Sequence, residues 1–173
     1  ISRFFCIFAR HILRIYLLQE QHNNSTLTTT PFHTDKTAMT YEIMAPVGSR
    51  EAFAAALKAG ADSIYFGIES LNMRSHSASK FTIEDLHDIA AQCEEKGVKS
   101  YLTVNTIIYG EDLALMRKIC DAAKEANISA VIAADVAVLS YCRTINQEVH
   151  LSTQLNISNE EALRFYSAFA DVV

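Results

Sequence analysis

Polar side chains that could bind a ligand recur at every second position in residues 148–156. In a β-strand, such alternation places the polar side chains on one face and the intervening Leu151 and Leu155 on the other. Amides and hydroxyls both donate and accept hydrogen bonds, so this face suits a ligand with a planar polar edge. The alternating polar residues are His150, Ser152, Gln154 and Asn156.

A second apolar segment shows the same alternation, with Tyr101, Thr103 and Asn105 on one predicted face. The opposite face is apolar and must pack under helices, so the polar face would point into the protein. A buried amide is costly unless it is hydrogen-bonded. Two interpretations stay open: a hydrogen-bonded network in the core, or ligand contacts at the strand ends. We favour ligand contacts for the residues nearest the carboxyl ends of the strands, which are Asn105, Gln154 and Asn156.

The loop of residues 72–80 carries three basic side chains and no acidic one, and it leads into the predicted start of a helix at Thr82. Cationic donors beside a helix N-terminus could bind a phosphate or another anion, although an ordinary solvated loop is an equal alternative. Asp135 ends a later predicted strand at the same edge. It could contact a ligand or cap the next helix, and we slightly favour the cap. The basic residues of the loop are Arg74, His76 and Lys80.

These segments together give a set of candidate substrate-binding residues near the carboxyl ends of the predicted strands. We predict no metal ligand among them and assign no catalytic residue, because no third group stands beside the Ser152–His150 pair. The sequence has no G-x-S-x-G, H-E-x-x-H or Walker motif. The candidates are Asn72, Arg74, Asn105, Asp135, Ser152, Gln154 and Asn156.

Residues 39–173 alternate short apolar segments with stretches of helical periodicity, which predicts parallel strands joined by helices in right-handed crossovers. An α/β fold of the (β/α) TIM-barrel-like class competes with an open doubly wound sheet. The barrel is favoured because no G-x-G-x-x-G follows the first strand and because polar residues alternate within later strands. The predicted strands are 41–47, 63–67, 100–107, 130–134, 148–156 and an opening one at Val172.

Residues that end or begin helices recur between these segments. Gly60, Gly97 and Asn127 each follow a helical segment, at the point where a left-handed residue can end a helix. Ser158 and Glu161 have the spacing of a capping box and predict the start of a further helix. The repeated order of helix end, tight turn and buried strand indicates a repeating unit.

The 173 residues are 50% hydrophobic with a net charge of −5, which excludes a disordered chain and a generic basic nucleic-acid binder. Residues 1–38 differ, with four basic and two acidic residues and an apolar stretch too short and too charged to span a bilayer. We expect them to form a disordered or artefactual extension outside the core, or an amphipathic surface helix. Residues 39–173 would then be an incomplete barrel, since a full one needs about 250 residues. They hold about five strand–helix units and the start of a sixth strand.

Four cysteines, at positions 6, 93, 120 and 142, show neither a C-x-x-C pair nor a zinc-ligand spacing. This usage fits a reducing cytoplasm better than an oxidising compartment. Cys93, Cys120 and Cys142 fall on apolar helix stripes, so we interpret them as buried small hydrophobic residues.

Six ordered motifs run through residues 39–173. They are YEIMAPVGS at 41–49, AGADSIYFG at 59–67, NMR at 72–74, LTVN at 102–105, AD at 134–135 and LSTQLN at 151–156. This series resembles the N-terminal part of the collagenase-like peptidases, family U-32. The resemblance implies a TIM-barrel-like domain and an iron–sulfur cluster held by cysteines in a more C-terminal region. We therefore expect no cofactor within this chain, whose helix cysteines do not match the cluster ligands.

Members of this family are named as peptidases or collagenases, and others take part in hydroxylating tRNA uridine, ribosomal RNA or ubiquinone. The resemblance implies an enzyme in the intact protein, with RNA or peptide as substrate. We favour RNA hydroxylation over proteolysis, because the sequence offers no nucleophile with a base in reach. The basic loop around Arg74 and the amides of 148–156 also suit a phosphate-bearing or planar polar ligand. The resemblance also leaves open a role as a partner in ubiquinone hydroxylation, and the short chain leaves open an inert truncated barrel.

Overall fold

The computed structural model describes residues 41–68, 70–72 and 81–173, and residues 42–173 form one compact unit. The predicted extension of residues 1–38 lies outside the described residues, as do Arg74, His76 and Lys80 of the basic loop. Within the described ranges, no helix is long and apolar enough to cross a membrane.

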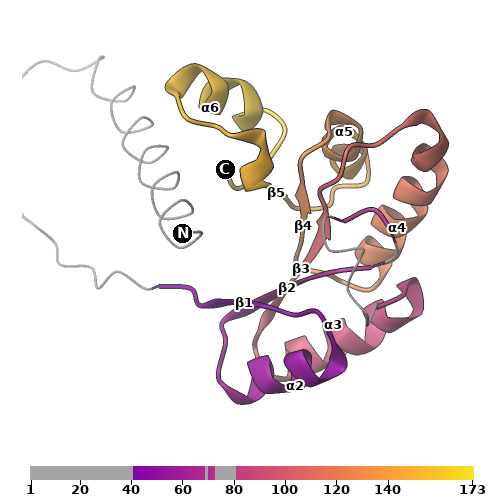
Figure 1. The fold of residues 1–173 in the computed structure, drawn as a ribbon, viewed down its shortest axis with the longest axis vertical. Helices are drawn as coiled ribbons and strands as arrows, with labels where there is room; N and C mark the ends of the chain where they lie inside the picture. Colours follow the sequence, from indigo (N-terminus) through magenta and orange to yellow (C-terminus); the bar gives the residue numbers. More distant parts are fainter. Residues whose placement is uncertain (1–40, 69, 73–80) are drawn as a thin grey trace, which may run out of the picture. The chain divides into compact units, whose positions relative to one another are not determined.

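Five parallel strands form one sheet in which each strand lies beside the strand that precedes it in the chain (Figure 1). A doubly wound sheet reverses this order at a switch point, whereas an order that follows the chain is that of a (β/α) barrel. The predicted fold class is therefore confirmed. His150 also forms an isolated parallel bridge with Val172, where the sequence predicts the opening of a sixth strand. The strands are β1 (Met44–Pro46), β2 (Ser63–Gly67), β3 (Lys99–Val104), β4 (Ala130–Ala133) and β5 (Val149–Leu151).

Helices α2 to α5 lie along one face of the sheet, and the hydrophobic core fills the space between these two layers (Figure 1). Strand residues on this face are fully buried, among them Phe66, Leu102 and Val131 at 0% exposure. Each helix turns an apolar stripe toward the sheet, as Met116 and Cys120 do on α4. The helices are α2 (Arg50–Lys58), α3 (Leu86–Glu95), α4 (Leu113–Glu125), α5 (Val136–Thr144) and α6 (Glu160–Ser167), with 3-10 turns η1 (Ile83–Asp85), η2 (Gly110–Asp112) and η3 (Thr153–Leu155).

Left-handed residues follow the helices where the sequence predicts them, as Asn127 does after α4 with a φ of 58°. The predicted capping box at Ser158 is wrong by one residue. The N-cap of α6 is Asn159, whose Oδ1 accepts a hydrogen bond from Ala162 N at 2.9 Å. Asparagine caps helices as well as serine does, so the two neighbouring residues compete and the backbone geometry decides.

The predicted strand 148–156 is shorter than expected, because β5 ends at Leu151. Ser152 is the N-cap of η3, and its Oγ accepts a hydrogen bond from Gln154 N at 3.4 Å. Such a local bond from a side chain to the backbone competes with strand pairing. Asn156 then adopts a φ of 49°. The alternation that would place Gln154 and Asn156 beside Ser152 therefore stops at Ser152.

Candidate functional site

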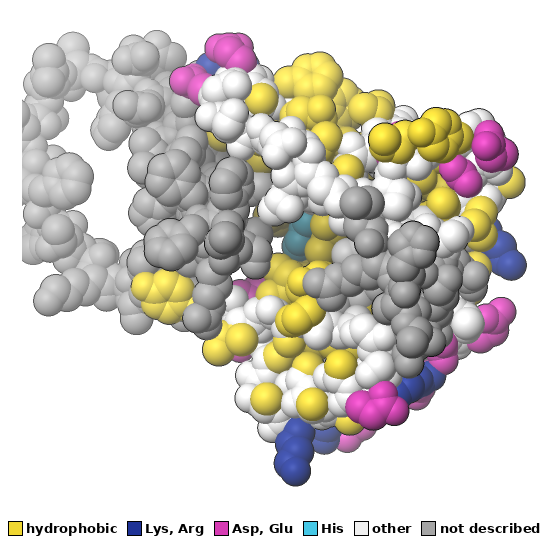
Figure 2. Space-filling view, in the orientation of Figure 1, with side chains coloured by type: hydrophobic (Ala, Val, Ile, Leu, Met, Phe, Trp, Pro, Cys, Tyr) yellow, Lys and Arg dark blue, Asp and Glu magenta, His cyan; other side chains and the backbone are white. Residues whose placement is uncertain are grey.

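The face of the sheet that is turned away from the helices carries polar and aromatic side chains, as the alternation predicts. Along β3, Leu102 packs into the core under the helices, while Tyr101 and Thr103 alternate onto the opposite face. The strand register extends this face sideways, since Thr103 pairs with Ile132 and Ile132 pairs with His150. In the space-filling view, a histidine side chain is visible at the centre among hydrophobic side chains (Figure 2).

Two predicted site residues from strands that are not neighbours meet at the carboxyl edge of the sheet. Asn105 Nδ2 donates a hydrogen bond to Ser152 Oγ at 3.5 Å, although 47 positions separate the two residues in the chain. Ser152 N donates to Ala133 O at 2.7 Å, which fixes the end of β5 beside β4. Ser152 is only 6% exposed. The pair therefore forms a held amide–hydroxyl unit that reaches across the end of β4.

Asp135 lies at the same edge, at the start of α5. Its Oδ1 accepts a hydrogen bond from Ala137 N at 2.8 Å, and its Oδ2 accepts one from Ile108 N at 3.1 Å. One carboxylate thus caps α5 and fixes the loop that follows β3. This geometry favours the cap over a ligand contact for Asp135.

Asn72 follows β2 and folds back against the last residue of that strand. Its Nδ2 donates a hydrogen bond to Ile68 O at 2.8 Å, and the side chain is 3% exposed. Gly67 makes the room for it, because a Cβ at position 67 would overlap the Asn72 amide. Sequence reasoning missed Gly67. The available signal was a glycine at the end of a buried strand, which often marks a close approach of another group.

The other predicted residues do not join this edge. Gln154 and Asn156 are exposed, and Asn156 Nδ2 donates to Gln154 O at 3.1 Å within the turn. Arg74 lies outside the described residues. The residues that remain at the carboxyl edge are Asn72, Asn105, Asp135 and Ser152.

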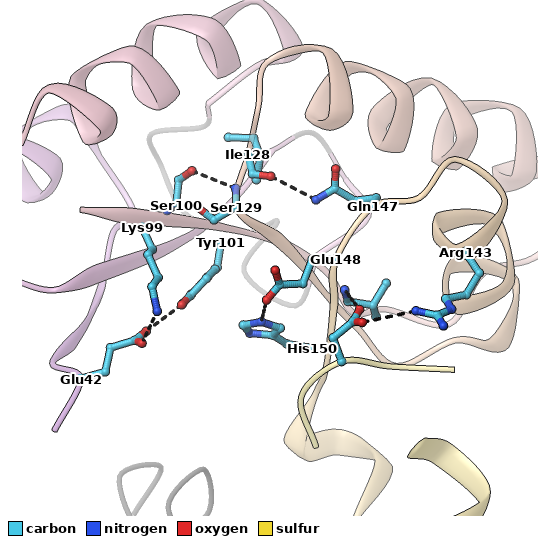
Figure 3. Close-up of polar contacts among 12 residues, drawn as sticks. Glu42, Lys99, Ser100, Tyr101, Ile128, Ser129, Arg143, Gln147, Glu148 and His150 are labelled. Atoms are coloured by element: carbon cyan, nitrogen blue, oxygen red, sulfur yellow. Dashed lines mark hydrogen bonds and ion pairs between the residues drawn. The ribbon is translucent and has the colours of Figure 1, made fainter. Parts of the chain in front are cut away.

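A second polar group on the same face lies toward the amino ends of the strands (Figure 3). The sequence places Tyr101 and His150 on this face, but it does not predict their contacts with charged residues. Glu42 accepts hydrogen bonds from Tyr101 Oη at 2.7 Å and from Lys99 Nζ at 2.9 Å. The Tyr101 ring packs with its centroid 4.8 Å from that of His150, whose Nε2 lies 2.9 Å from Glu148 Oε1. Burial acts to raise the pKa of Glu42, but the bonds from Lys99 and Tyr101 outweigh it and hold that pKa below its usual value. Groups at the amino face of a barrel serve stability, so we assign them a structural role.

The three described cysteines do not fit an iron–sulfur cluster. Cys93 lies on α3, Cys120 on α4 and Cys142 on α5, and all three are buried. A cluster needs several thiolates, commonly four, that converge on one point. In the part of the chain that the structure describes, no group of three or more His, Cys, Asp or Glu side chains is placed to hold a metal. The interpretation of these cysteines as buried residues is confirmed.

Comparison with known proteins finds relatives that carry different names. A relative named Collagenase, from Porphyromonas gingivalis, is 70% identical over 133 residues, which are 77% of this chain and 32% of the relative. The tRNA hydroxylation protein P1 of Bacillus subtilis is 34% identical over 127 residues, which are 72% of this chain and 30% of the relative. A 23S rRNA 5-hydroxycytidine synthase of Escherichia coli is 26% identical, over 73% of this chain and 19% of the relative. The chain thus spans about a third or less of the length of these relatives.

A solved structure of a U32 peptidase superposes with a TM-score of 0.61 at 13% identity, covering 84% of this chain and 61% of that one. At this identity the likeness concerns the fold, and it agrees with the strand order described above. The model of peptidase family U32 matches residues 48–171, which is most of the described chain. Together with the 70% identical relative, this match shows that the chain belongs to peptidase family U32.

Proposed function

We propose that the intact protein takes part in hydroxylating a pyrimidine base in RNA, and that this chain supplies part of the surface that binds the base. The observation that carries the proposal is the Asn105–Ser152 pair, a neutral amide and hydroxyl held together across the end of β4. Ligands of (β/α) barrels bind at this carboxyl edge. An amide offers both a donor and an acceptor, which match the polar edge of an unpaired base.

The surroundings of the pair support a binding role. Asp135 fixes the loop that begins at Asn105, because its Oδ2 accepts a hydrogen bond from Ile108 N. Asn72 places a further buried amide at the end of the neighbouring β2. Binding groups whose positions are set before the ligand arrives lose less conformational freedom on binding.

The names of the relatives support the same substrate class. The Bacillus subtilis relative is named for tRNA hydroxylation, and proteins from Helicobacter pylori with a similar name are 28% and 29% identical. The Escherichia coli relative is named for hydroxycytidine in ribosomal RNA. These names share the hydroxylation of RNA, and the Escherichia coli name specifies a pyrimidine, cytidine, which supports the substrate class proposed for the intact protein.

Hydroxylation also needs a redox group, and the described cysteines do not provide one. We place the iron–sulfur cluster implied by the family resemblance in the part of family members that this chain does not span. This chain then binds the substrate and does not transfer electrons. The described cysteines are free thiols, which supports a reducing compartment such as the cytoplasm.

Proteolysis is the second candidate, because the relative at 70% identity is named Collagenase. The described contacts of Ser152 Oγ are with the Asn105 amide and with Gln154 N. His150, two residues earlier, directs its Nε2 to Glu148. A serine nucleophile needs a base within hydrogen-bond reach. The geometry around Ser152 therefore favours binding over nucleophilic attack.

Nucleoside analysis of tRNA and ribosomal RNA from a strain that lacks the gene tests the proposal. The strain should lose a hydroxylated pyrimidine that the wild-type gene restores. Genes with Asn105→Ala or Ser152→Ala should restore less of it, whereas Gln92→Ala, an amide change on the helix side, should restore it fully. Unchanged nucleosides in the deletion strain would overturn the proposal. Cleavage of gelatin by the purified protein with chelator present, and its loss in Ser152→Ala, would support the second candidate instead.

A further inference from the structure

Two buried thiols face each other across the packed helices α4 and α5. Cys120 Sγ and Cys142 Sγ are 3.8 Å apart, and both side chains are 0% exposed. Burial alone does not produce such a pair. Cys93 on α3 is 1% exposed and forms no sulfur pair within the described part of the chain.

The contacts on either side of the thiols fix how the two helices meet. Tyr141 Oη donates to both carboxylate oxygens of Asp121, at 2.8 and 3.0 Å. The Arg117 guanidinium lies 5.8 Å from the centroid of the Tyr141 ring, and Lys124 Nζ donates to Asn146 O at 2.6 Å. Asp121 and Tyr141 directly neighbour the two cysteines in the sequence. The thiols are therefore held opposite each other by a set of contacts between α4 and α5.

We propose that Cys120 and Cys142 are an oxidisable dithiol that closes to a reversible disulfide between α4 and α5. A disulfide has an S–S length of about 2.05 Å, so the two sulfurs must approach by about 1.8 Å. Met116 Sδ lies 3.9 Å from Cys120 Sγ. Its flexible thioether can fill the space that the moving sulfur leaves.

Hydrogen peroxide is the two-electron oxidant that we propose for this reaction, in which two thiols and one peroxide give one disulfide and two waters. One cysteine, as the thiolate, attacks a peroxide oxygen and breaks the O–O bond, which gives a sulfenic acid and, after protonation, one water. The second thiol attacks that sulfur, loses its proton, forms the S–S bond and releases the second water. Since both thiols are buried, peroxide enters by local opening of the α4–α5 contact, so the reaction is slow in the native state.

The position of the pair connects it to the candidate site. Helix α4 follows the loop that leaves β3 through Asn105, and α5 begins at Asp135. Asp135 joins these two segments through Ile108 N at one end of the helix pair. A disulfide between Cys120 and Cys142 would add a covalent link between α4 and α5 to this hydrogen bond. It would therefore restrict the motion of the loops at the carboxyl edge.

Mass spectrometry of the full chain after peroxide treatment and alkylation tests the proposal. The wild type should lose two hydrogen atoms and yield a linked peptide pair that holds Cys120 and Cys142, and dithiothreitol should reverse both changes. A Cys6→Ser/Cys93→Ser variant should give the same result. Cys120→Ala and Cys142→Ala should each abolish the link.

A second test changes the contact between α4 and α5 and leaves both cysteines in place. Tyr141→Phe removes the bonds to Asp121, so the α4–α5 contact opens more readily and the linkage should form several-fold faster. Tyr109→Phe, at an exposed tyrosine, should leave the rate unchanged. Two thiols that stay fully alkylatable after peroxide would overturn the proposal. A sulfinic acid on one of them, or a disulfide to Cys6 or Cys93 in place of the pair, would also overturn it.

Discussion

The backbone of Gly67 and the side chain of Asn72 occupy adjoining space, and a Cβ at position 67 would lie 2.7 Å from Asn72 Nδ2. The same amide nitrogen donates to Ile68 O at 2.8 Å. The end of β2 and the residues after it therefore form one folded-back unit. The missing side chain at Gly67 is what allows a buried amide to lie at the edge where barrels bind their ligands.

Replacing Gly67 with alanine should destabilise the protein by about 1–3 kcal/mol, because the added methyl overlaps a buried amide. Adding Asn72→Ala to the same chain should recover part of this loss, since the methyl then has room. Urea unfolding of the two single variants and the double variant measures the coupling. Gly48→Ala is the control, because nothing lies within 4 Å of a Cβ there. Strictly additive losses at 67 and 72 would contradict the contact.

Replacing Asp135 with alanine should lower the free energy of unfolding by about 1–2 kcal/mol, as expected for the loss of a helix cap. The change also frees Ile108 N from its acceptor. Asp135→Asn keeps one acceptor oxygen for Ala137 N and should lose less. Denaturant unfolding compares both variants with Glu111→Ala, at an exposed acidic residue of η2. Equal losses in the alanine and asparagine variants would show that the cap is not the cause.

The free energy of unfolding should fall at alkaline pH because the buried Cys93 thiol resists ionisation in the folded state. Burial raises the pKa of this thiol from 9.0 to about 11. The folded state holds the proton more tightly than the unfolded state, so this stabilisation is complete below about pH 9 and is lost as the pH rises toward 11. Cys93→Ala lacks the titrating group. The stability advantage of the wild type over this variant should therefore shrink by about 1.4 kcal/mol per pH unit in that window.

Unfolding free energies of the two proteins, measured at intervals from about pH 8 to about pH 10.5, check this expectation. Other groups that titrate in this range act on both proteins and cancel in the difference. A difference that stays constant with pH would mean that the Cys93 thiol ionises as easily in the folded state as in the unfolded chain.

The free energy of unfolding should also fall in acid, because the pKa of Glu42 is lowered in the folded state whereas that of Cys93 is raised. Hydrogen bonds from Lys99 and Tyr101 outweigh burial and hold the pKa of Glu42 below its usual 4.5. This carboxylate therefore contributes stability above that pH, and the contribution is lost as the pH falls through the lower folded value. Glu42→Gln should remove it, so the stabilities of variant and wild type should converge in acid. Glu94→Gln on the surface of α3 is the control, and a gap for Glu42→Gln that widens in acid would contradict the network.

The repeating fold was predictable because its signals are local. The short apolar segments at 63–67 and 130–134 and the helix ends at Gly60, Gly97 and Asn127 each depend on a few adjacent residues, and the structure confirms them. The contacts of Glu42 with Tyr101 and of Gly67 with Asn72 depend instead on how the chain folds back. No spacing in the sequence specifies these contacts.

The candidate site was predictable only where it depends on the alternation within a strand. Alternation correctly placed Asn105 and Ser152 on one face, and the structure brings them into contact. It failed for Gln154 and Asn156, because the bond from Gln154 N to Ser152 Oγ starts a 3-10 turn where the pattern predicts a strand. A local side-chain bond of this kind overrides a two-residue period without changing the hydrophobic pattern.

The order of the strands has a consequence for how the protein is made. Each described strand after β1 pairs with the one that precedes it, as Lys99 of β3 does with Ser63 of β2. Ser63 and Lys99 are 36 positions apart, so this parallel pairing closes a long loop and forms more slowly than the local contacts of a helical bundle. Synthesis proceeds from the N-terminal side, and structured units form as they emerge. During translation, each new strand of this sheet meets an edge that has already formed.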